Sequence, residues 1–206
     1  MTQADASARG SVEVPAGWWQ WNPGIGSVGL LVEHPDVPGG SGWGVVLTQV
    51  GDVSRDPCDR SAGIHARDDV DTPAELAAVM ASWPGFQGTP AGPINFGDVQ
   101  GVHTQLITSS TSPLCTGPVL WTTPAGTPID GYPMVAGAGV SMDGYPGDFR
   151  IIDLDGQLIA IRAMGSAETS PYERQQSIEA DPDRHAADLV TQQGIIDSIR
   201  FEEPAP

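Results

Sequence analysis

The sequence predicts an α+β fold: an antiparallel β-sheet of about six strands, two main helices packed on one face of it, and one disulfide. Residues 149–163 are the first reason, because two β-rich runs flank Asp155-Gly156, a pair typical of a two-residue type I′ hairpin. Helical patterns that begin near Thr72 and Asp181 are the second reason. The third is composition, because Gly (26) and Pro (19) exceed a fifth of the 206 residues, which favours turns and short strands.

The N-terminal segment, residues 1–11, is mostly small and polar and is predicted to be a disordered tail or linker before a single domain at 12–203. Trp18, Trp19 and Trp21 then crowd into four positions. Aromatics this dense either cover an edge of the core or form a stacking platform for a ligand such as a sugar. The sequence leaves both interpretations open.

Residues 24–29, GIGSVG, match the GxGxxG pattern of dinucleotide-binding proteins. That fingerprint needs a buried strand before it and a helix that begins within it. Trp-Asn-Pro precedes this copy, and two prolines and a double glycine lie within residues 35–40, which exclude a useful helix. We therefore predict strands at Leu30–Glu33 and Trp43–Val50, and no nucleotide site.

A capped helix is predicted in the middle of the chain. Thr72 is the expected N-cap, Pro73 takes the first helical position, Glu75 completes a capping box, and Trp83-Pro84-Gly85 ends the helix. Strands are expected at 94–99 and 102–108, joined around Gln100-Gly101, and at 119–122.

Residues 124–148 are rich in turns, and DGYP occurs twice in them and would present Tyr132 and Tyr145. The 149–163 hairpin follows and is the expected centre of the domain. The last helix is expected to begin at Asp181-Pro182 and to end with the run IIDSIRF.

Charge and cysteine content limit the partners. Acidic residues number 26 and basic residues 9, so the net charge of −17 should repel nucleic acid and anionic lipid; it serves either solubility or binding of a cationic partner.

No apolar run approaches the roughly 20 residues of a membrane span, and no signal peptide is evident, so the chain is either cytosolic or preceded by a leader or anchor. The loop residues Cys58 and Cys115 suggest one structural disulfide formed outside the cytoplasm; two unrelated thiols are the alternative.

No motif indicates a reaction, metal or cofactor. The four histidines lack metal-ligand spacing, and no GxSxG elbow is present, so a hydrolase using Asp/Glu or Ser with His103 is an alternative only. Asp153, Asp155 and Gly156 resemble a calcium loop, but its sixth position is Leu158, so a hairpin turn is expected. A weak surface Ca²⁺ site would have to use Asp130, Asp143, Asp148, Asp153 and Asp155.

The order of several motifs resembles a known family. Asp56-Pro57-Cys58 follows a strand; next come a helix beginning TPAEL, Trp83-Pro84-Gly85, a strand pair, Cys115, the run IIDLDGQLIAI and the terminal IIDSIRF. Over about residues 43–202 this is similar to an uncharacterised family of extracytoplasmic domains from high-GC Gram-positive bacteria, often tethered behind a transmembrane helix or lipid anchor. More remotely, the final hairpin and helix resemble the Mog1/PsbP-like fold. The resemblance implies a surface-exposed domain with one disulfide and no known catalytic machinery.

Together these observations favour a non-catalytic extracytoplasmic module, secreted or anchored at the cell surface, that binds an unknown protein, small molecule or glycan. We expect no nucleic-acid partner, no cofactor, and membrane contact only through an anchor absent from this chain. The alternatives are a hydrolase and a structural or assembly domain of a membrane-bound complex. The residues expected to contact a ligand are Trp18, Trp19, Trp21, Tyr132 and Tyr145.

Overall fold

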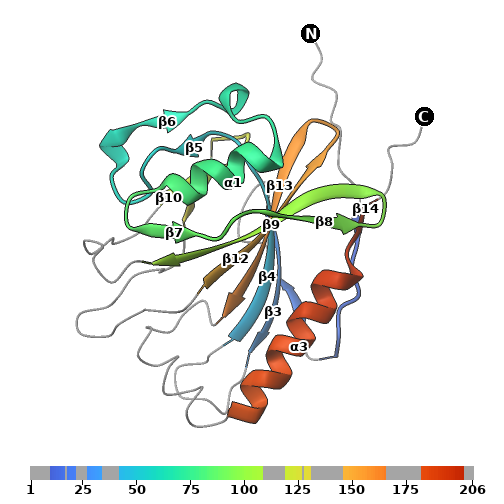
Figure 1. Ribbon diagram of the computed structural model, residues 1–206. Helices are drawn as coiled ribbons and strands as arrows, with labels where there is room; N and C mark the ends of the chain where they lie inside the picture. The colour runs from blue at the N-terminus through green and yellow to red at the C-terminus, as the bar shows by residue number, and fades with distance from the viewer. Residues whose placement is uncertain are drawn as a thin grey trace.

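The chain folds around one large antiparallel sheet (Figure 1). The computed structural model describes residues 10–16, 18–21, 27–33, 42–108, 119–126, 128–130, 146–165 and 182–201. In these residues the largest sheet has eight strands in the order β2-β3-β4-β13-β12-β9-β7, with β8 also paired to β9. The strands are β2 (Trp19–Trp21), β3 (Ser27–Glu33), β4 (Gly42–Gln49), β7 (Phe86–Gly88), β8 (Gly92–Phe96), β9 (Val99–Thr108), β12 (Pro146–Leu154) and β13 (Gln157–Gly165).

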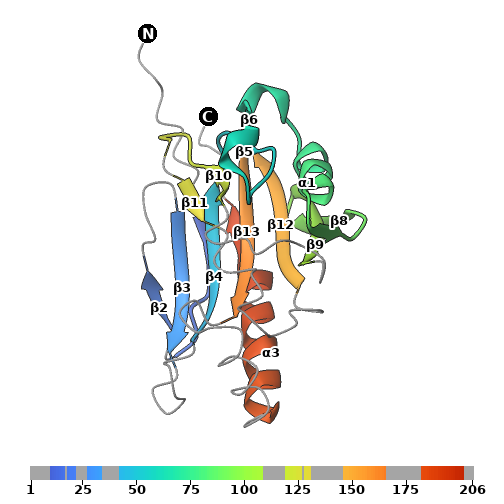
Figure 2. The ribbon, with the colours of Figure 1, turned by 90° about the vertical axis from the view of Figure 1, so that its left-hand side faces the viewer.

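The β12–β13 hairpin lies in the middle of this sheet, as the sequence predicts (Figure 2). Leu154 pairs with Gln157, and the residues between them, Asp155 and Gly156, have φ angles of 54° and 79°. Two successive positive φ values are typical of a type I′ turn, so the predicted turn is confirmed. The Gly156 amide donates a 2.7 Å hydrogen bond to Oδ1 of Asp153, which closes the turn and gives this carboxylate a structural task.

Neighbouring residues of β12 belong to two separate cores, one on each face of the sheet. Phe149 and Ile151 pack in a core with α1 (Pro73–Ser82), whereas Ile152 packs in a core with α3 (Pro182–Ser198). Successive side chains of a strand point to opposite faces, so the two helices cover opposite faces, as Figure 1 shows. The prediction that both helices pack on one face is therefore wrong.

A small second sheet completes the α1 side. Its strands, in sheet order, are β11 (Pro128–Asp130), β10 (Val119–Thr122), β5 (Val53–Ser54) and β6 (Ile64–His65). Leu120 and Trp121 of β10 are buried in the same core as α1. The buried indole N–H of Trp83, just after α1, donates a 2.8 Å hydrogen bond to the carbonyl of Ser54, so the helix is joined to β5.

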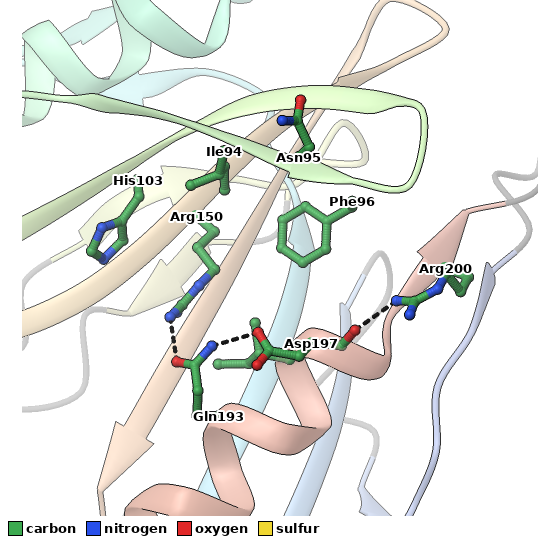
Figure 3. Close-up of a pocket in the computed structure, with 9 residues that line it drawn as sticks. Ile94, Asn95, Phe96, His103, Arg150, Gln193, Asp197 and Arg200 are labelled. Atoms are coloured by element: carbon green, nitrogen blue, oxygen red, sulfur yellow. Dashed lines mark hydrogen bonds between the residues drawn. The ribbon is translucent and has the colours of Figure 1, made fainter.

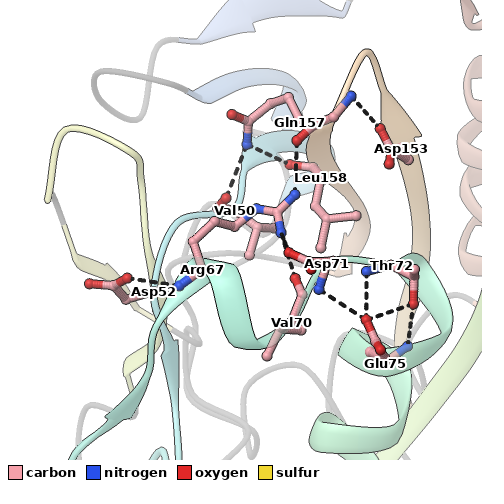
Figure 4. A network of polar contacts seen from close by, with 11 residues as sticks. Val50, Asp52, Arg67, Val70, Asp71, Thr72, Glu75, Asp153, Gln157 and Leu158 are labelled. Carbon is pink, nitrogen blue, oxygen red and sulfur yellow. Dashed lines mark hydrogen bonds and ion pairs between the residues drawn. The ribbon is translucent and has the colours of Figure 1, made fainter.

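Polar contacts connect the start of α1 to the central hairpin (Figure 4). The Thr72 hydroxyl accepts a hydrogen bond from the Glu75 amide, and the Glu75 carboxylate accepts one from the Thr72 amide, which confirms the predicted capping box. Arg67 donates from Nη2 to the carbonyl of Gly156 at 2.9 Å and from Nη1 to that of Val70 at 2.6 Å. The loop before α1 is thereby held against the hairpin turn.

The C-terminal end differs from the sequence prediction. The helix α3 ends at Ser198, and Arg200–Phe201 form β14, which pairs with β1 (Gly10–Ser11). Gly10 and Ser11, which the sequence assigns to the tail, are therefore strand residues. Among the described side chains, the C-terminal turn of α3 contributes Ile195 and Ile196 to the core, and Ile199, just after the helix, joins them.

Two more predictions about the strands are corrected. The described residues form fourteen strands in three sheets, not about six strands in one. Four of these strands are only two residues long, too short to show the alternation by which a strand is identified. The turn between β8 and β9 is at Gly97-Asp98, because Phe96 pairs with Val99, and Gly101 lies within β9 opposite Ile152.

Only one of the two cysteines of the predicted disulfide lies within the described residues. Cys58 is disulfide-bonded. The other cysteine of the chain, Cys115, lies outside the described residues, so the described part of the structure does not establish the Cys58–Cys115 pair as part of the fold.

No helix in the described ranges is long and apolar enough to cross a membrane.

Candidate functional site

A pocket of about 340 Å³ lies on the α3 side of the sheet, where the β8–β9 hairpin, β12 and the last turns of α3 meet (Figure 3). Strand β9 contributes one polar side chain, β12 one buried cation, and α3 with β14 a row of polar and charged groups. The lining residues are Ile94, Asn95, Phe96, His103, Arg150, Gln193, Ile196, Asp197 and Arg200.

Strand register brings the polar groups together. Arg150 of β12 pairs directly with His103 of β9, and both side chains lie on the face that α3 covers. Asp148 is two residues before Arg150 and therefore points to the same face. In β8, Ile94 and Phe96 also belong to the α3-side core, so the hairpin supplies an apolar wall above these polar groups.

A chain of polar contacts runs from β9 to the end of α3. His103 Nε2 lies 2.6 Å from Oδ1 of Asp148, and the other carboxylate oxygen, Oδ2, lies 3.3 Å from Arg150 Nη1. Arg150 Nη2 donates to Oε1 of Gln193 at 2.8 Å, and Gln193 Nε2 donates to Oδ1 of Asp197 at 2.6 Å. Each side chain is therefore oriented by its neighbour.

Arg150 is the unusual member of this chain because it is a buried cation. The residue is only 8% exposed, and its Nη1 has no hydrogen-bond partner within the described structure, despite the nearby Asp148 carboxylate. A buried donor left unsatisfied costs about 1–3 kcal/mol, more when the group is charged. The fold therefore keeps a guanidinium N–H in this pocket without a hydrogen bond.

Histidine and aspartate in contact are a feature of hydrolase sites, so the alternative function has one observation in its favour. Asp148 orients His103 at 2.6 Å, as the carboxylate of a catalytic triad would. However, no Ser, Thr, Cys or Lys is among the described residues that line the pocket. The described part of the chain also contains no group of three or more potential metal ligands. The described residues that line the pocket therefore supply no nucleophile to this pair.

The residues predicted to bind a ligand are not those that line the pocket. Trp18 is partly buried against the α3-side core, which agrees with the core interpretation of this residue. Trp19 and Trp21 belong to β2, and their side chains are outside the described structure. Tyr132 and Tyr145 lie outside the described residues altogether.

Sequence reasoning named His103 but missed Arg150, Gln193 and Asp197. One signal was available: Arg150 interrupts the apolar run of a strand that is buried on both faces. Arginine is almost never fully buried unless it is paired, so a cation at such a position indicates a specific partner or ligand. The partner, Gln193, is 43 residues away, and no local pattern connects the two.

Comparisons with known proteins add little to this geometry. No protein-family model and no curated protein matches the sequence, so nothing found supports the Mog1/PsbP-like comparison or a match to the extracytoplasmic family. A solved structure with a similar chain path is that of LpqN, described as involved in cell envelope biogenesis of Mycobacterium tuberculosis. It is 14% identical, with 98% of this chain and 88% of that chain covered, at a TM-score of 0.38. A TM-score this low carries no argument about function.

Proposed function

We propose that this chain is a non-catalytic binding module, and that its binding site is the pocket between the β8–β9 hairpin and α3. The observation that carries the proposal is the buried guanidinium of Arg150, which keeps an N–H without a hydrogen bond at the wall of a pocket. Ligand pockets generally measure about 300–1,000 Å³ and combine apolar walls with a few placed polar groups. At about 340 Å³, this pocket fits a small molecule or one side chain of a larger ligand.

Binding is a better account of this pocket than hydrolysis. A hydrolase needs a nucleophile or an activated water beside its base, together with donors for the developing oxyanion. His103 has Asp148 on one side and no nucleophile among the pocket residues on the other. We therefore keep hydrolysis as the second candidate, supported only by the His103–Asp148 contact. The extracytoplasmic location remains part of the proposal and rests on the family resemblance.

An amide-resolved NMR titration of the ¹⁵N-labelled chain tests the site. Small organic probes that carry a ring and either a polar or a charged group are added one at a time. Binding in the pocket should shift amide signals of 94–96 and 103 in the β8–β9 hairpin, 150 in β12, and 193–200 at the end of α3 and in β14. Shifts confined to 18–21 would instead locate the site at the tryptophans and overturn the proposal.

The hydrolase alternative is tested with the same protein. Release of nitrophenol from p-nitrophenyl acetate is compared between the wild type and His103→Ala. A non-catalytic module should give slow release that does not saturate with substrate in either protein, because no Ser, Thr, Cys or Lys is among the described residues that line the pocket. A rate that depends on His103 and saturates with substrate would favour the enzyme.

A further inference from the structure

We propose that the ligand of this pocket is a small organic monocarboxylate with an apolar body, bound by the guanidinium of Arg150. This inference rests on the proposed function, because it names the class of ligand for the same site.

The donors suit a carboxylate. Arg150 Nη1 has no hydrogen-bond partner in the described structure, and Nη2 donates only to a neutral amide oxygen, that of Gln193. A guanidinium presents two parallel N–H groups that match the two oxygens of a carboxylate, and such charge-assisted pairs are roughly twice as strong as neutral hydrogen bonds. The present neighbours of the guanidinium are the Asp148 carboxylate, 3.3 Å from Nη1 without a hydrogen bond, and the neutral Gln193 amide, whereas a ligand carboxylate would accept hydrogen bonds from both Nη1 and Nη2.

The side chain that yields is Gln193. It is an exposed residue of α3, and its amide lies between Arg150 and Asp197, as Figure 3 shows. An incoming carboxylate takes the place of its Oε1 at Nη2 and also accepts from Nη1. The released Gln193 amide is satisfied by water, because this side chain is at the surface. Gln193 thus occupies the acceptor position of the ligand when the pocket is empty.

The charges around the site favour a single negative charge. Arg150 and Arg200 are two of only nine basic residues in the chain; Arg150 pairs with the Asp148 carboxylate, and Arg200 and Asp197 both line the pocket, where Arg200 Nη1 donates to the backbone carbonyl of Asp197. Formal charges on these four groups cancel. A dianion such as a phosphate monoester would meet two nearby carboxylates, and like charges at close range are repulsive. A monoanion needs only one guanidinium.

Apolar side chains that line the pocket are the reason for the apolar body of the proposed ligand. Ile94, Phe96 and Ile196 line the pocket and belong to the α3-side core. Burial of apolar surface against them contributes about 25 cal/mol per Å². A carboxylate without such a body would bind weakly, because the acidic chain as a whole repels anions.

The test compares three phenyl probes of similar size by NMR titration: phenylacetate, its neutral amide phenylacetamide, and phenyl phosphate. Phenylacetate should shift the pocket amides with a Kd about tenfold or more below those of the other two, since hydrogen bonds to a charged partner contribute about 1.5–3 kcal/mol. Equal affinity for phenylacetamide would overturn the carboxylate assignment and leave the proposed binding site standing. If none of the probes shifts these amides, the proposed function fails as well.

Variants separate the guanidinium from the general shape of the pocket. Gln193→Glu places a carboxylate of the chain itself against Arg150 and should abolish phenylacetate binding, whereas Gln87→Glu, the same change at an exposed residue of β7, should leave it unchanged. Arg150→Lys keeps the charge but loses the two-pronged geometry, and should raise the Kd of phenylacetate about tenfold. Unchanged affinity in Gln193→Glu overturns the inference even if the Arg150 variant proves too unstable to measure.

Discussion

The two-sided burial of the central hairpin is the structural result most open to direct test. Ile151 and Ile152 are adjacent in β12, and each is 0% exposed, yet they belong to different cores. We expect Ile151→Ala and Ile152→Ala to destabilise the protein by similar amounts. If both helices covered one face, one of the two residues would be exposed and its truncation would cost little.

The magnitude follows from the burial. Truncation of a fully buried isoleucine to alanine removes apolar surface and leaves a cavity, at a cost of about 2–5 kcal/mol in the free energy of unfolding. Ile64 of β6 is a matched control, because it is a strand isoleucine that is 50% exposed. Ile64→Ala should cost about 1 kcal/mol or less, because surface substitutions usually have small effects.

Urea denaturation, followed by tryptophan fluorescence and by far-UV circular dichroism, measures these differences. The two transitions should coincide if unfolding is cooperative, and the slope with urea should be the same in all variants. A loss of under about 1 kcal/mol for either Ile151→Ala or Ile152→Ala, equal to that of Ile64→Ala, would refute the two-sided sheet.

Four further predictions concern single residues. Thr72→Ala should cost about 1 kcal/mol in urea denaturation. Hydrogen bonds from Thr72, its side chain first, hold the pKa of Glu75 below its usual 4.5, so the stability that Glu75 contributes is complete above pH 4.5 and is lost as the pH falls through the lowered value. The difference between Glu75→Gln and the wild type should therefore shrink in acid; a constant difference would contradict the capping role. Gly101→Ala should destabilise by about 1–3 kcal/mol, because a Cβ there overlaps a backbone carbonyl of β12, whereas Gly92→Ala in β8, with open space around it, should not. Trp18→Ala should lower the melting temperature, because this indole packs on the α3-side core; loss of ligand binding at unchanged stability would favour the stacking platform instead.

Local chemistry explains why some elements were predictable. The turn at Asp155-Gly156 and the capping box of Thr72 and Glu75 each depend on residues within three positions of one another, and both are present as predicted. The arrangement of the helices was not predictable in the same way. The run Leu158–Ile161 has no polar face, and such a run is typical of a strand buried on both sides. Assigning both helices to one face overlooked that signal.

The candidate site could be predicted only in part, because its contacts join distant segments. His103 was named as the histidine of a hypothetical hydrolase, but its contact with Asp148 spans 45 residues and depends on the β9–β12 register. The aromatic cluster was named because it is dense in sequence; Trp18 packs against the α3-side core, and a ligand contact at the cluster stays a prediction. Density along the chain is a poor guide to a pocket that is assembled from three separate segments.

The energetic cost of Arg150 is the strongest reason to look for function at this place. A buried ion pair rarely stabilises a fold more than well-packed apolar residues of similar volume would. The same face of the sheet offers that apolar alternative, since Ile152 and Ile161 beside Arg150 are fully buried in the core. A leucine or methionine at position 150 would extend this core without a desolvated charge. The ion pair with Asp148 therefore does not by itself explain a guanidinium at this position, and for this reason the proposed carboxylate site is tested at Arg150.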